Sequence, residues 1–546
     1  MKEFASEPLV KRLVDWGVDT VFGLHGDGPD GVVQVFRRHQ DRIRLVLVHH
    51  EEAAAFMASG YAKTTGKIGV CLATSGPGAV HLLNGLYDAK LDHQPVLAIT
   101  ENQEVQLLGT SFQQEIRLEE VFRDVADYNV RVDVPVQIPG LVDIGIGHAV
   151  GRGTVSHITF PSTLEPGAVE GAAWMMAPAS APTAPVFMPA PGTPPASDLE
   201  RAAAVLNQGS RVALLVGVGG LEAREELLAV AELLASPIVK SLPGKAAVPD
   251  DHPMSTGCIG VYGTKPAEDA LEGADTLLVV GTNFPYALHL PEPGKVRTVQ
   301  IETDLLRVVG RSSTEVPLVG DAAETLQALL PLLQRKQNRE FLRQSQAAMA
   351  RWRERLAALE APGHDPIRPQ YLMRVVDRLA ADDAVLASDS GVTAVWSARH
   401  FDVRGDRSYL VSANLNTMSA GLPYMIAAQW AHPGRQCIAF VSSEGFAKLM
   451  AEFLTAAEYD LPIKVVVNNT SAQRGQLQAE ARGGRTRAPA SFAAWASACG
   501  ALGLRVEGAA EIEDAIEQAL KYEGPALVDV VVNPAELPRP AVLGGA

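Results

Sequence analysis

Glu51 stands where a carboxyl group could take part in acid–base chemistry. Glu51 and Glu52 lead an alanine-rich segment, residues 53–58, that predicts a helix. A carboxyl group that becomes buried there acquires a raised pKa, so it can exchange a proton nearer to neutral pH. The same two acidic residues also suit the positive end of a helix. We expect Glu51 to line a site, with helix stabilisation as the plainer interpretation.

A glycine-rich turn in the middle of the chain could approach a nucleotide. Gly217, Gly219 and Gly220 directly follow a predicted strand at residues 212–216 and precede a helical segment. In this context a turn without side chains lets the backbone come close to a nucleotide. Because turns between strands and helices favour glycine in general, the motif needs support from other residues.

The totals over 546 residues limit what the protein can be. This length predicts about three domains of roughly 150 residues each. A net charge of −16 gives no electrostatic reason to bind nucleic acid or an anionic membrane. No apolar run approaches the ~20 residues that span a bilayer, and the N-terminus lacks the apolar core of a signal peptide. Four cysteines without metal-type spacing predict buried free thiols, so we expect a soluble, cytoplasmic protein.

Two breaks divide the sequence into three segments. Residues 177–197 are rich in Pro and Ala and predict an extended connector. Residues 334–366 are polar, contain a predicted helix at 340–359 and predict a second connector. The other segments alternate short apolar strands with helical patterns, which is typical of parallel sheets covered by helices. The predicted fold class is therefore α/β, with parallel-sheet domains at residues 1–176, 198–333 and 367–546.

Short motifs spread over nearly the whole chain resemble those of a known enzyme family. In order they are HEEAAAFMA (50–58), TSGPG (74–78), NGLYDA (84–89), SFQQE (111–115), LPGK (242–245), GTNFPY (281–286) and TMSAGLP (417–423). In this order and spacing they resemble the thiamine diphosphate (ThDP)-dependent family that includes pyruvate oxidase and acetolactate synthase. The resemblance implies a pyrimidine-binding, a central and a diphosphate-binding domain. It also implies a homodimer or homotetramer with active sites at the subunit interface.

The resemblance gives a meaning to Ser442-Ser443-Glu444-Gly445, which follows a predicted strand at 437–441 and precedes a predicted helix at 446–453. Relatives read Gly-Asp-Gly-Gly at this junction, and the Asp holds the divalent cation that clamps the ThDP diphosphate. Here Ser443 takes the Asp position, and a neutral hydroxyl offsets none of the diphosphate charge. Ser419 likewise stands where relatives usually have Gly.

Several altered residues in one pocket lead us to expect that Mg²⁺ and ThDP are not bound. Met418, Ser443, Glu444 and Asn469 would then form a vestigial ThDP site, and we predict no metal ligands. Met418 is retained where the family props its cofactor, although Met is equally a core filler. Glu444 and Asn469 could still hold a metal in the alternative hypothesis.

The resemblance also implies FAD in the central domain. Residues 241–245, ending at Lys245, resemble a flavin-contacting loop, and Thr282, Asn283 and Phe284 belong to a segment that passes the FAD in pyruvate oxidases. Glu302 stands where relatives often have an acidic residue near the adenosine ribose. We expect these residues, with Gly217, Gly219, Gly220 and Asp321, to bind FAD. A central domain that keeps the fold but has lost its nucleotide is the alternative.

Further departures from the relatives fall in the same cleft. His25 stands where relatives usually carry Pro, and Glu101 replaces a Gly at the end of a predicted strand. In the family, the residue matching Glu51 bonds a ring nitrogen of the cofactor, and the residue matching Gln113 shapes the substrate and flavin region. Because ligands bind at the ends of parallel strands, new titratable groups there favour changed acid–base chemistry. We expect Glu51, His25 and Glu101 as acid–base residues and Gln113 as a positioning residue.

Three functions stay open at this point. The leading hypothesis is a flavoenzyme on the pyruvate oxidase scaffold that acts on a small acid or carbonyl compound with FAD rather than ThDP. The second is a ThDP- and Mg²⁺-dependent 2-oxo acid decarboxylase, oxidase or carboligase in which Glu444 and Asn469 hold the metal. The third is a non-catalytic scaffold, against which the retained flavin-type loops speak.

Overall fold

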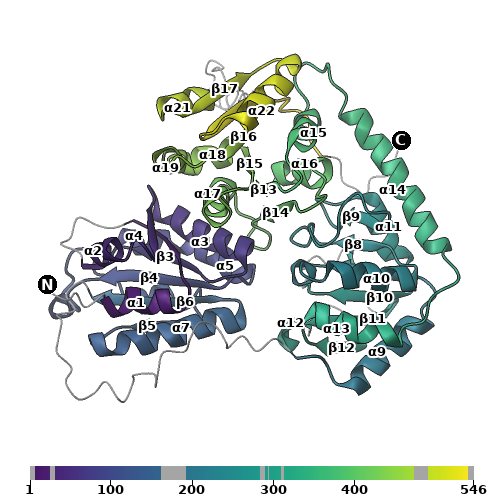
Figure 1. Cartoon of the computed structure of the whole chain (residues 1–546), viewed down its shortest axis with the longest axis horizontal. Coiled ribbons are helices and arrows are strands. Elements are labelled where there is room, and N and C mark those ends of the chain that lie inside the picture. The colour runs from purple at the N-terminus through teal and green to yellow at the C-terminus, as the bar shows by residue number, and fades with distance from the viewer. Residues whose placement is uncertain are drawn as a thin grey trace.

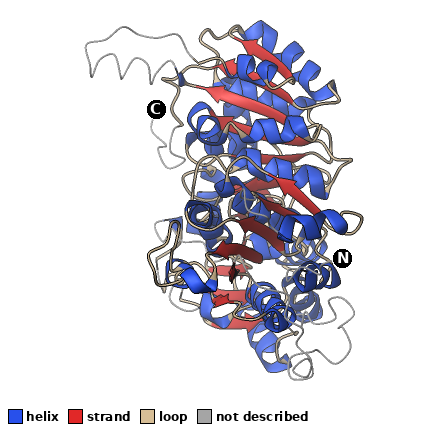
Figure 2. Cartoon of the chain, turned by 90° about the vertical axis from the view of Figure 1, so that its left-hand side faces the viewer, coloured by secondary structure: helices blue, strands red, loops and turns tan. Residues whose placement is uncertain are grey.

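Three parallel sheets form the frame of the protein (Figure 1). The computed structural model describes residues 7–24, 31–161, 192–282, 289–292, 294–308, 313–471 and 490–538, with the backbone alone at 31–34. Over these residues each sheet has six strands, all parallel, and Figure 2 shows helices on both sides of the strands. The predicted α/β class with three parallel-sheet domains is confirmed.

The N-terminal sheet has the strand order β2-β1-β3-β4-β6-β5. Its four inner strands are almost entirely buried, as strands covered on both faces must be, whereas the edge strands β2 and β5 are partly exposed. They are β1 (Thr20–Gly23), β2 (Arg44–Leu47), β3 (Gly69–Ala73), β4 (Val96–Asn102), β5 (Tyr128–Arg131) and β6 (Val155–Pro161). The helices of this domain are α1 (Glu7–Asp15), α2 (Gly31–Arg38), α3 (Glu51–Thr65), α4 (Pro77–His81), α5 (Leu83–Leu91), α6 (Leu118–Val121) and α7 (Ile138–Arg152).

The middle sheet has the order β12-β11-β10-β7-β8-β9, which is that of a doubly wound dinucleotide-binding fold. Its strands are β7 (Val212–Val216), β8 (Ile238–Lys240), β9 (Ser255–Cys258), β10 (Thr276–Val280), β11 (Arg297–Glu302) and β12 (Val316–Val319). Its helices are α9 (Ala196–Gln208), α10 (Arg224–Leu234), α11 (Lys265–Gly273), α12 (Leu305–Val308) and α13 (Ala322–Leu329).

The C-terminal sheet, in the order β14-β13-β15-β16-β18-β17, repeats the topology of the N-terminal sheet. Its strands are β13 (Val385–Ser388), β14 (Ser408–Val411), β15 (Cys437–Ser442), β16 (Lys464–Asn469), β17 (Leu502–Val506) and β18 (Ala526–Val531). The helices are α15 (Pro369–Leu379), α16 (Val392–His400), α17 (Gly421–Ala431), α18 (Ser443–Leu449), α19 (Glu452–Glu458), α21 (Phe492–Ala498) and α22 (Ile512–Lys521). The sequence shows no repeat, so this shared topology comes from the structure alone.

Helix packing joins the N-terminal and C-terminal domains. Helices α3 and α17 pack closely against each other, and their side chains belong to one hydrophobic core that includes Phe56, Tyr424 and Phe453. Small residues allow this close approach, because a Cβ atom on Gly60 would lie 2.9 Å from the Cα of Tyr424. The two domains therefore fold as one hydrophobic unit.

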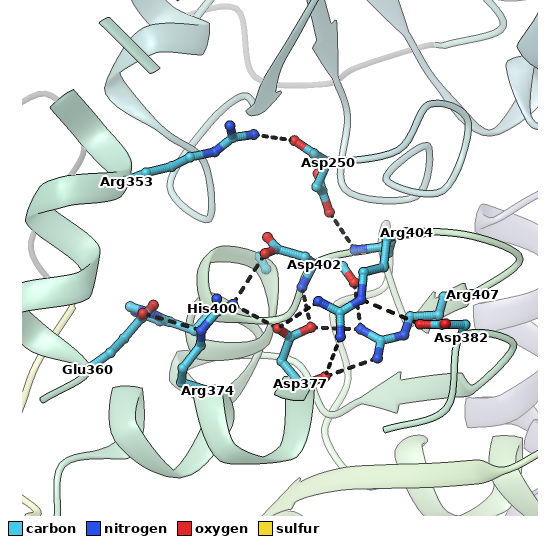
Figure 3. Close-up of polar contacts among 12 residues, drawn as sticks. Asp250, Arg353, Glu360, Arg374, Asp377, Asp382, His400, Asp402, Arg404 and Arg407 are labelled. Atoms are coloured by element: carbon cyan, nitrogen blue, oxygen red, sulfur yellow. Dashed lines mark hydrogen bonds and ion pairs between the residues drawn. The ribbon is translucent and has the colours of Figure 1, made fainter. Parts of the chain in front are cut away.

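A polar network joins the middle and C-terminal domains, and Figure 3 shows it. Asp250, in the loop after β8, accepts a hydrogen bond from the backbone N–H of Val403 at 2.8 Å. The guanidinium of Arg353 donates to the Asp250 carbonyl at 2.6 Å. Arg353 lies on the connecting helix α14 (Glu340–Leu359), which runs along the outside of both domains in Figure 1. Within the C-terminal domain, the buried side chains of Arg407 and Asp377 form an ion pair at 2.7 Å.

Element ends differ from prediction at two junctions. Helix α9 begins at Ala196, inside the predicted connector. Helix α18 begins at Ser443 rather than at the predicted Phe446, because the hydroxyl of Ser442 caps it by accepting the N–H of Gly445 at 2.9 Å. Residues 446–453, predicted as one helix, belong to two short helices, the end of α18 and the start of α19. The predicted helix at 340–359 coincides with α14.

The cysteines form no disulfide bonds. All four cysteines are free thiols; three are buried, and Cys499 is partly exposed, contrary to the prediction that all are buried. Cys499 follows the end of α21, at the domain surface. Among the described residues, no helix combines the length and the apolar character that crossing a membrane requires.

Candidate cofactor sites and acid–base residues

The glycine turns of the middle domain meet where the strand order changes direction. This point lies between β7 and β10, and ligands bind outside such points in doubly wound sheets. The N–H of Gly219 donates to the carbonyl of Gly281 at 3.0 Å, and a Cβ on Gly219 would lie 2.8 Å from the Cα of Gly281. Gly281 has φ +56°, a conformation that favours glycine. Only glycine lets the two turns approach so closely.

A cavity of about 190 Å³ opens beside these turns. Gly219 and Gly281 line it together with Glu302, Arg307 and the loop at residues 92–94 of the N-terminal domain. The carboxylate of Glu302 accepts the N–H of Thr303 at 3.0 Å and lies 3.8 Å from the Arg307 guanidinium, and burial raises the pKa of Glu302. A carboxylate suits ribose hydroxyls and a guanidinium suits phosphate. These residues fit a nucleotide.

The other predicted flavin residues have more varied places. Gly220 packs against Val216, and Thr282 is buried against Gly217. Asp321 caps α13 by accepting the N–H of Glu324 at 3.0 Å, so its carboxylate already has a structural role beside the cavity. The predicted contacts at Asn283 and Phe284 lie outside the described residues.

Lys245 is committed to protein contacts. Its ammonium donates to Asp250 at 2.6 Å and to the carbonyl of Ala398 at 3.0 Å, and the residue is 2% exposed. Asp250 also receives the ammonium of Lys240 at 2.6 Å. The amine of Lys245 therefore fastens the middle domain to the C-terminal domain rather than reaching toward a nucleotide.

The C-terminal sheet changes direction between β13 and β15, and Asp389 lies at this point. The carboxylate of Asp389 accepts the N–H groups of Gly421 and Ser442, each at 3.2 Å. Burial raises the pKa of Asp389 to about 6, partly offset by these N–H donors. The N–H groups of Gly421 and Ser442 are thus already hydrogen-bonded to a carboxylate of the protein itself.

Ser443 and Asn469 lie side by side but bond to protein partners. The hydroxyl of Ser443 donates to Glu444 at 3.0 Å and accepts the N–H of Thr470 at 3.2 Å. The amide nitrogen of Asn469 donates to Asp529 at 2.7 Å and to the carbonyl of Ala490 at 2.9 Å. Among the described residues, Glu444 is the carboxylate at the start of α18, and one of its oxygens accepts from Ser443. Ser443 and Asn469 are neutral and bonded to protein, so this set is poorer in carboxylates than a Mg²⁺–diphosphate pair usually takes.

The surroundings of this junction are tight. Among the described residues, Ser419, Val441 and Gly445 leave no space for a water molecule between them. Ser419 has φ +74°, which a glycine adopts more easily. Met418, predicted to prop a cofactor, is 39% exposed rather than part of the core.

Glu51 lies at the first turn of α3, paired with a histidine that the sequence did not single out. Glu51 is 7% exposed, and its carboxylate lies 2.9 Å from Nδ1 of His81. The rings of His81 and His50 stack with centroids 4.6 Å apart. Gly78 passes directly over the carboxylate, since a Cβ there would lie 2.8 Å from Glu51 Oε1. The side chain of His81 is 45% exposed, so this acid–base pair opens to one side of the chain.

The grouping has the composition of a cation site. One ligand atom each from His50, Glu51 and His81 lies within 4.8 Å of the others. The hydrogen bond between Glu51 and His81 accounts for the approach without an ion, and we assign no metal to it.

A second residue missed in the sequence reaches this site from the C-terminal domain. Glu452, fully buried at the start of α19, accepts the backbone N–H groups of His49 and His50 at 3.1 and 2.8 Å. Burial raises the pKa of Glu452 to about 7. The sequence placed Glu452 in a helix and indicated no further role. No local pattern reveals its contact with His50, because the two residues are 402 positions apart in the sequence.

Two of the remaining candidates lie in β4 and in the loop that follows it. Gln113 and Gln114 are both exposed, but Gln114 also contacts the TSGPG turn, where a Cβ on Gly76 would lie 2.7 Å from the Cβ of Gln114. Glu101 is partly exposed near the end of β4. His25 lies outside the described residues. The structure therefore places Gln114 rather than Gln113 against the turn that leads into α4 and His81.

Comparison with family models matches the three domains one by one. Residues 5–121 match the thiamine pyrophosphate enzyme N-terminal TPP binding domain. Residues 199–329 match the central domain of the same enzymes, and residues 389–530 match their C-terminal TPP binding domain. Thiamine pyrophosphate is ThDP, so the matched models cover both domains that carry the altered and retained residues described above.

Similar proteins align over almost the whole chain. A putative thiamine pyrophosphate-containing protein, YdaP, of Bacillus subtilis is 36% identical over 99% of this chain and 94% of its own length. The pyruvate oxidase of Lactiplantibacillus plantarum is 30% identical over 98% of this chain and 90% of its own. A probable acetolactate synthase large subunit of Methanocaldococcus jannaschii is 29% identical over 97% and 92%. The chain therefore belongs to the thiamine pyrophosphate enzyme family, in the branch that contains pyruvate oxidase and acetolactate synthase.

Proposed function

We propose that this protein is a flavoenzyme of the pyruvate oxidase and acetolactate synthase branch that acts on a small acid or carbonyl compound. The observation that carries the proposal is the cavity at the middle switch point, lined by Gly219, Gly281, Glu302 and Arg307. Glycine backbone, a buried carboxylate and a guanidinium there offer partners to phosphate and ribose groups. The predicted FAD contact at Asn283 and Phe284 would complete this site.

Bound FAD would supply electron transfer, while the protein supplies orientation and proton handling. The backbone of Gly217 and Gly219 and the carboxylate of Glu302 would hold the nucleotide. Glu51 with His81 would hold or move a proton, since the two side chains are 2.9 Å apart and open to one side. Glu101 and His25 stay predicted acid–base residues, and Gln113 a predicted positioning residue.

The proposal includes independence from ThDP. What supports it is the bonding of Ser443 and Asn469 to protein partners and the neutral hydroxyl of Ser443 at the position where relatives have Asp. The family descriptions and the names of the relatives favour the alternative, a ThDP- and Mg²⁺-dependent 2-oxo acid enzyme. One observation also favours it: Glu51 is retained, buried and paired at the start of α3. Glu444 and Asn469 would hold the metal in that case.

We further propose that the protein forms a homodimer or homotetramer in the cytoplasm. His81 and Met418 are both exposed, Met418 by 39%, so the surface on which the family interface would form is accessible in the single chain. The substrate is a small molecule, and neither nucleic acid nor a membrane is a partner. A non-catalytic scaffold is disfavoured because such a protein needs neither the nucleotide cavity nor the Glu51–His81 pair.

Cofactor stoichiometry tests the proposal. The purified protein is incubated with excess ThDP and Mg²⁺, desalted and extracted with acid, and the released cofactors are quantified by mass spectrometry. We expect about one FAD per chain and no retained ThDP. Stoichiometric ThDP in the wild-type protein would sink the flavin-only proposal and favour the 2-oxo acid alternative.

Two variants sharpen this test. Ser443→Asp combined with Glu444→Gly restores the junction seen in relatives, and we expect it to retain ThDP only in the presence of Mg²⁺ if the rest of the pocket is intact. Glu302→Ala should lower the FAD content, whereas Glu315→Ala, which removes an exposed carboxylate near the end of the same sheet, should not. Equal FAD in both would place the nucleotide elsewhere.

A further inference from the structure

Glu452 makes an unusual contact between the C-terminal and N-terminal domains. One carboxylate oxygen, Oε1, accepts two consecutive backbone N–H groups, those of His49 and His50. The other oxygen, Oε2, accepts the hydroxyl of Thr455 at 2.8 Å. The residue is fully buried, so each of these bonds replaces hydration that the carboxylate has lost.

The two N–H groups belong to the backbone that enters α3 directly before Glu51. His50 is the N-cap residue of α3, and its Nδ1 accepts the N–H of Glu52 at 3.2 Å. Its ring stacks on His81, whose Nδ1 pairs with Glu51. The hydroxyl oxygen of Tyr459, beyond the end of α19, also accepts the backbone N–H of Leu47 at 2.9 Å. A shift of this backbone would therefore change both the cap and the ring against which the Glu51–His81 pair is held.

We propose that Glu452 is a positioning residue whose carboxylate fixes the backbone at His49 and His50 and thereby sets Glu51 against His81. The inference rests on the proposed function only in giving Glu51 an acid–base role. The strength of the contact depends on whether Glu452 carries a proton.

The charge of Glu452 sets the strength of its hold. An ionised carboxylate accepts N–H groups in charge-assisted bonds that are roughly twice as strong as those to a neutral acceptor. Burial raises the pKa of Glu452 to about 7, and the N–H groups of His49 and His50 act against this rise, so while Glu452 stays buried its bonds to them are stronger in the ionised form. The titratable groups that face it are His49, His50 and Glu458; Glu458 turns its carboxylate to His49 Nε2 at 3.6 Å.

Hydrogen exchange of the full-length protein tests the contact without any assay of activity. The measurement follows the peptide covering residues 47–52 in the wild type, in Glu452→Gln, in Glu452→Leu and in the control Glu458→Gln. We expect Glu452→Leu to lower protection at least about tenfold, Glu452→Gln to lower it less because an amide oxygen still accepts, and Glu458→Gln to leave it unchanged. Unchanged protection in Glu452→Leu overturns the proposal.

The pH dependence supplies a test should Glu452→Leu not fold. Local opening that frees the two N–H groups while Glu452 stays buried differs from global unfolding, which also exposes Glu452 to water. For this local opening, wild-type protection of the peptide, corrected for intrinsic exchange, should fall about fivefold from pH 8 to pH 6, and that of Glu452→Gln should not change. A wild type and a Glu452→Gln with the same pH dependence would contradict a role for the carboxylate.

A second readout separates positioning of Glu51 from simple adhesion between domains. Diethylpyrocarbonate labels histidine nitrogens that are free of partners, so it reports the bond between His81 and Glu51. In Glu452→Gln and Glu452→Leu we expect labelling of His81 to rise at least about threefold at pH 6, with labelling of His432 as the internal reference. Lost peptide protection with unchanged labelling would mean adhesion alone. A failure of the cofactor experiments leaves these outcomes interpretable, because neither requires FAD or substrate.

Discussion

The middle and C-terminal sheets both change strand order at a point where ligands bind, but the two points are built differently. In the middle domain, Gly219 and Gly281 bring bare backbone together, and a cavity of about 190 Å³ lies beside them. In the C-terminal domain, the N–H groups of Gly421 and Ser442 point at the carboxylate of Asp389. One point has room beside its backbone, and the other is satisfied by the protein's own acid.

This difference shows how a fold can persist while a site changes. Sheet topology depends on apolar strands and their order, and these are the same in the N-terminal and C-terminal domains. The chemistry at the switch point depends on a few polar residues such as Ser443, which can change without cost to the strands behind them. The family membership is therefore read from the whole chain, whereas cofactor choice is decided by a few residues.

The largest expected effect comes from removing the link between the two regions. Asp250→Ala leaves the buried ammonium groups of Lys240 and Lys245 without their carboxylate and removes the acceptor of the Val403 N–H. Breaking a buried ion pair in this way costs about 3–5 kcal/mol. Calorimetry should show the melting temperature falling by several degrees, whereas Asp251→Ala, which changes an exposed neighbour, should leave it unchanged. Equal melting temperatures would mean that the two domains do not depend on this link.

Much of the fold was predictable because strands buried on both faces are continuously apolar. The runs at β7, β10 and β15 are visible in the sequence, and the α/β class follows from their alternation with helical patterns. The turn at Gly217–Gly220 was predictable for the same local reason. The long helix α14 was as well, since polar residues flank it on both sides.

The partners of the candidate residues could not be predicted, because they come from distant parts of the chain. Glu51 was singled out, but its partner His81 comes from another helix, and Glu452 bonds from another domain to the backbone of His50, next to Glu51. Lys245 was expected to contact a flavin, yet its partner Asp250 is charged and buried, which no local pattern shows. A pattern of residue types identifies candidates, and only the packed structure shows which of their atoms are already in use.

The second prediction concerns the acids of the C-terminal region. Burial raises the pKa of Glu452 from 4.5 to about 7, so the folded protein binds this proton more tightly than the unfolded chain. The favourable contribution is fully present below pH 4.5 and is lost as pH rises through 7, a difference of about 3 kcal/mol. Melting temperatures between pH 5 and pH 8 should therefore fall less in Glu452→Gln than in the wild type.

The exposed Glu458→Gln is the matched control for that series, because its side chain is 52% exposed. It should follow the wild-type pH dependence. If Glu452→Gln also follows it, Glu452 does not titrate in this range.

The third prediction concerns the open point in the middle domain. Gly219→Val places a branched side chain against the Cα of Gly281, where a Cβ alone would already be 2.8 Å away. The turns must then separate, and we expect FAD content after gel filtration to fall about tenfold, equivalent to about 1.4 kcal/mol of binding free energy. Gly434→Ala, where no atom lies within 4 Å of the added Cβ, should keep the wild-type content. Undiminished FAD in Gly219→Val would place the nucleotide away from these turns.

The smallest expected effect concerns backbone strain near the switch point of the C-terminal sheet. Ser419 has φ +74° and Ala235, at the end of α10 in the middle domain, has φ +50°, so a glycine should suit both better. Each replacement by Gly should stabilise the protein by up to about 1 kcal/mol, measured as a rise in melting temperature, with part of the gain offset by the greater freedom of the unfolded chain. Ala235→Gly should change nothing else, because that residue caps a helix far along the sequence from the junction.

Ser419 lies beside Gly445, so Ser419→Gly also loosens the filled junction and should raise any retention of ThDP by the Ser443→Asp, Glu444→Gly protein. A gain in stability without a gain in retention would show that the carboxylates and hydroxyls at this point, rather than its backbone, exclude the cofactor.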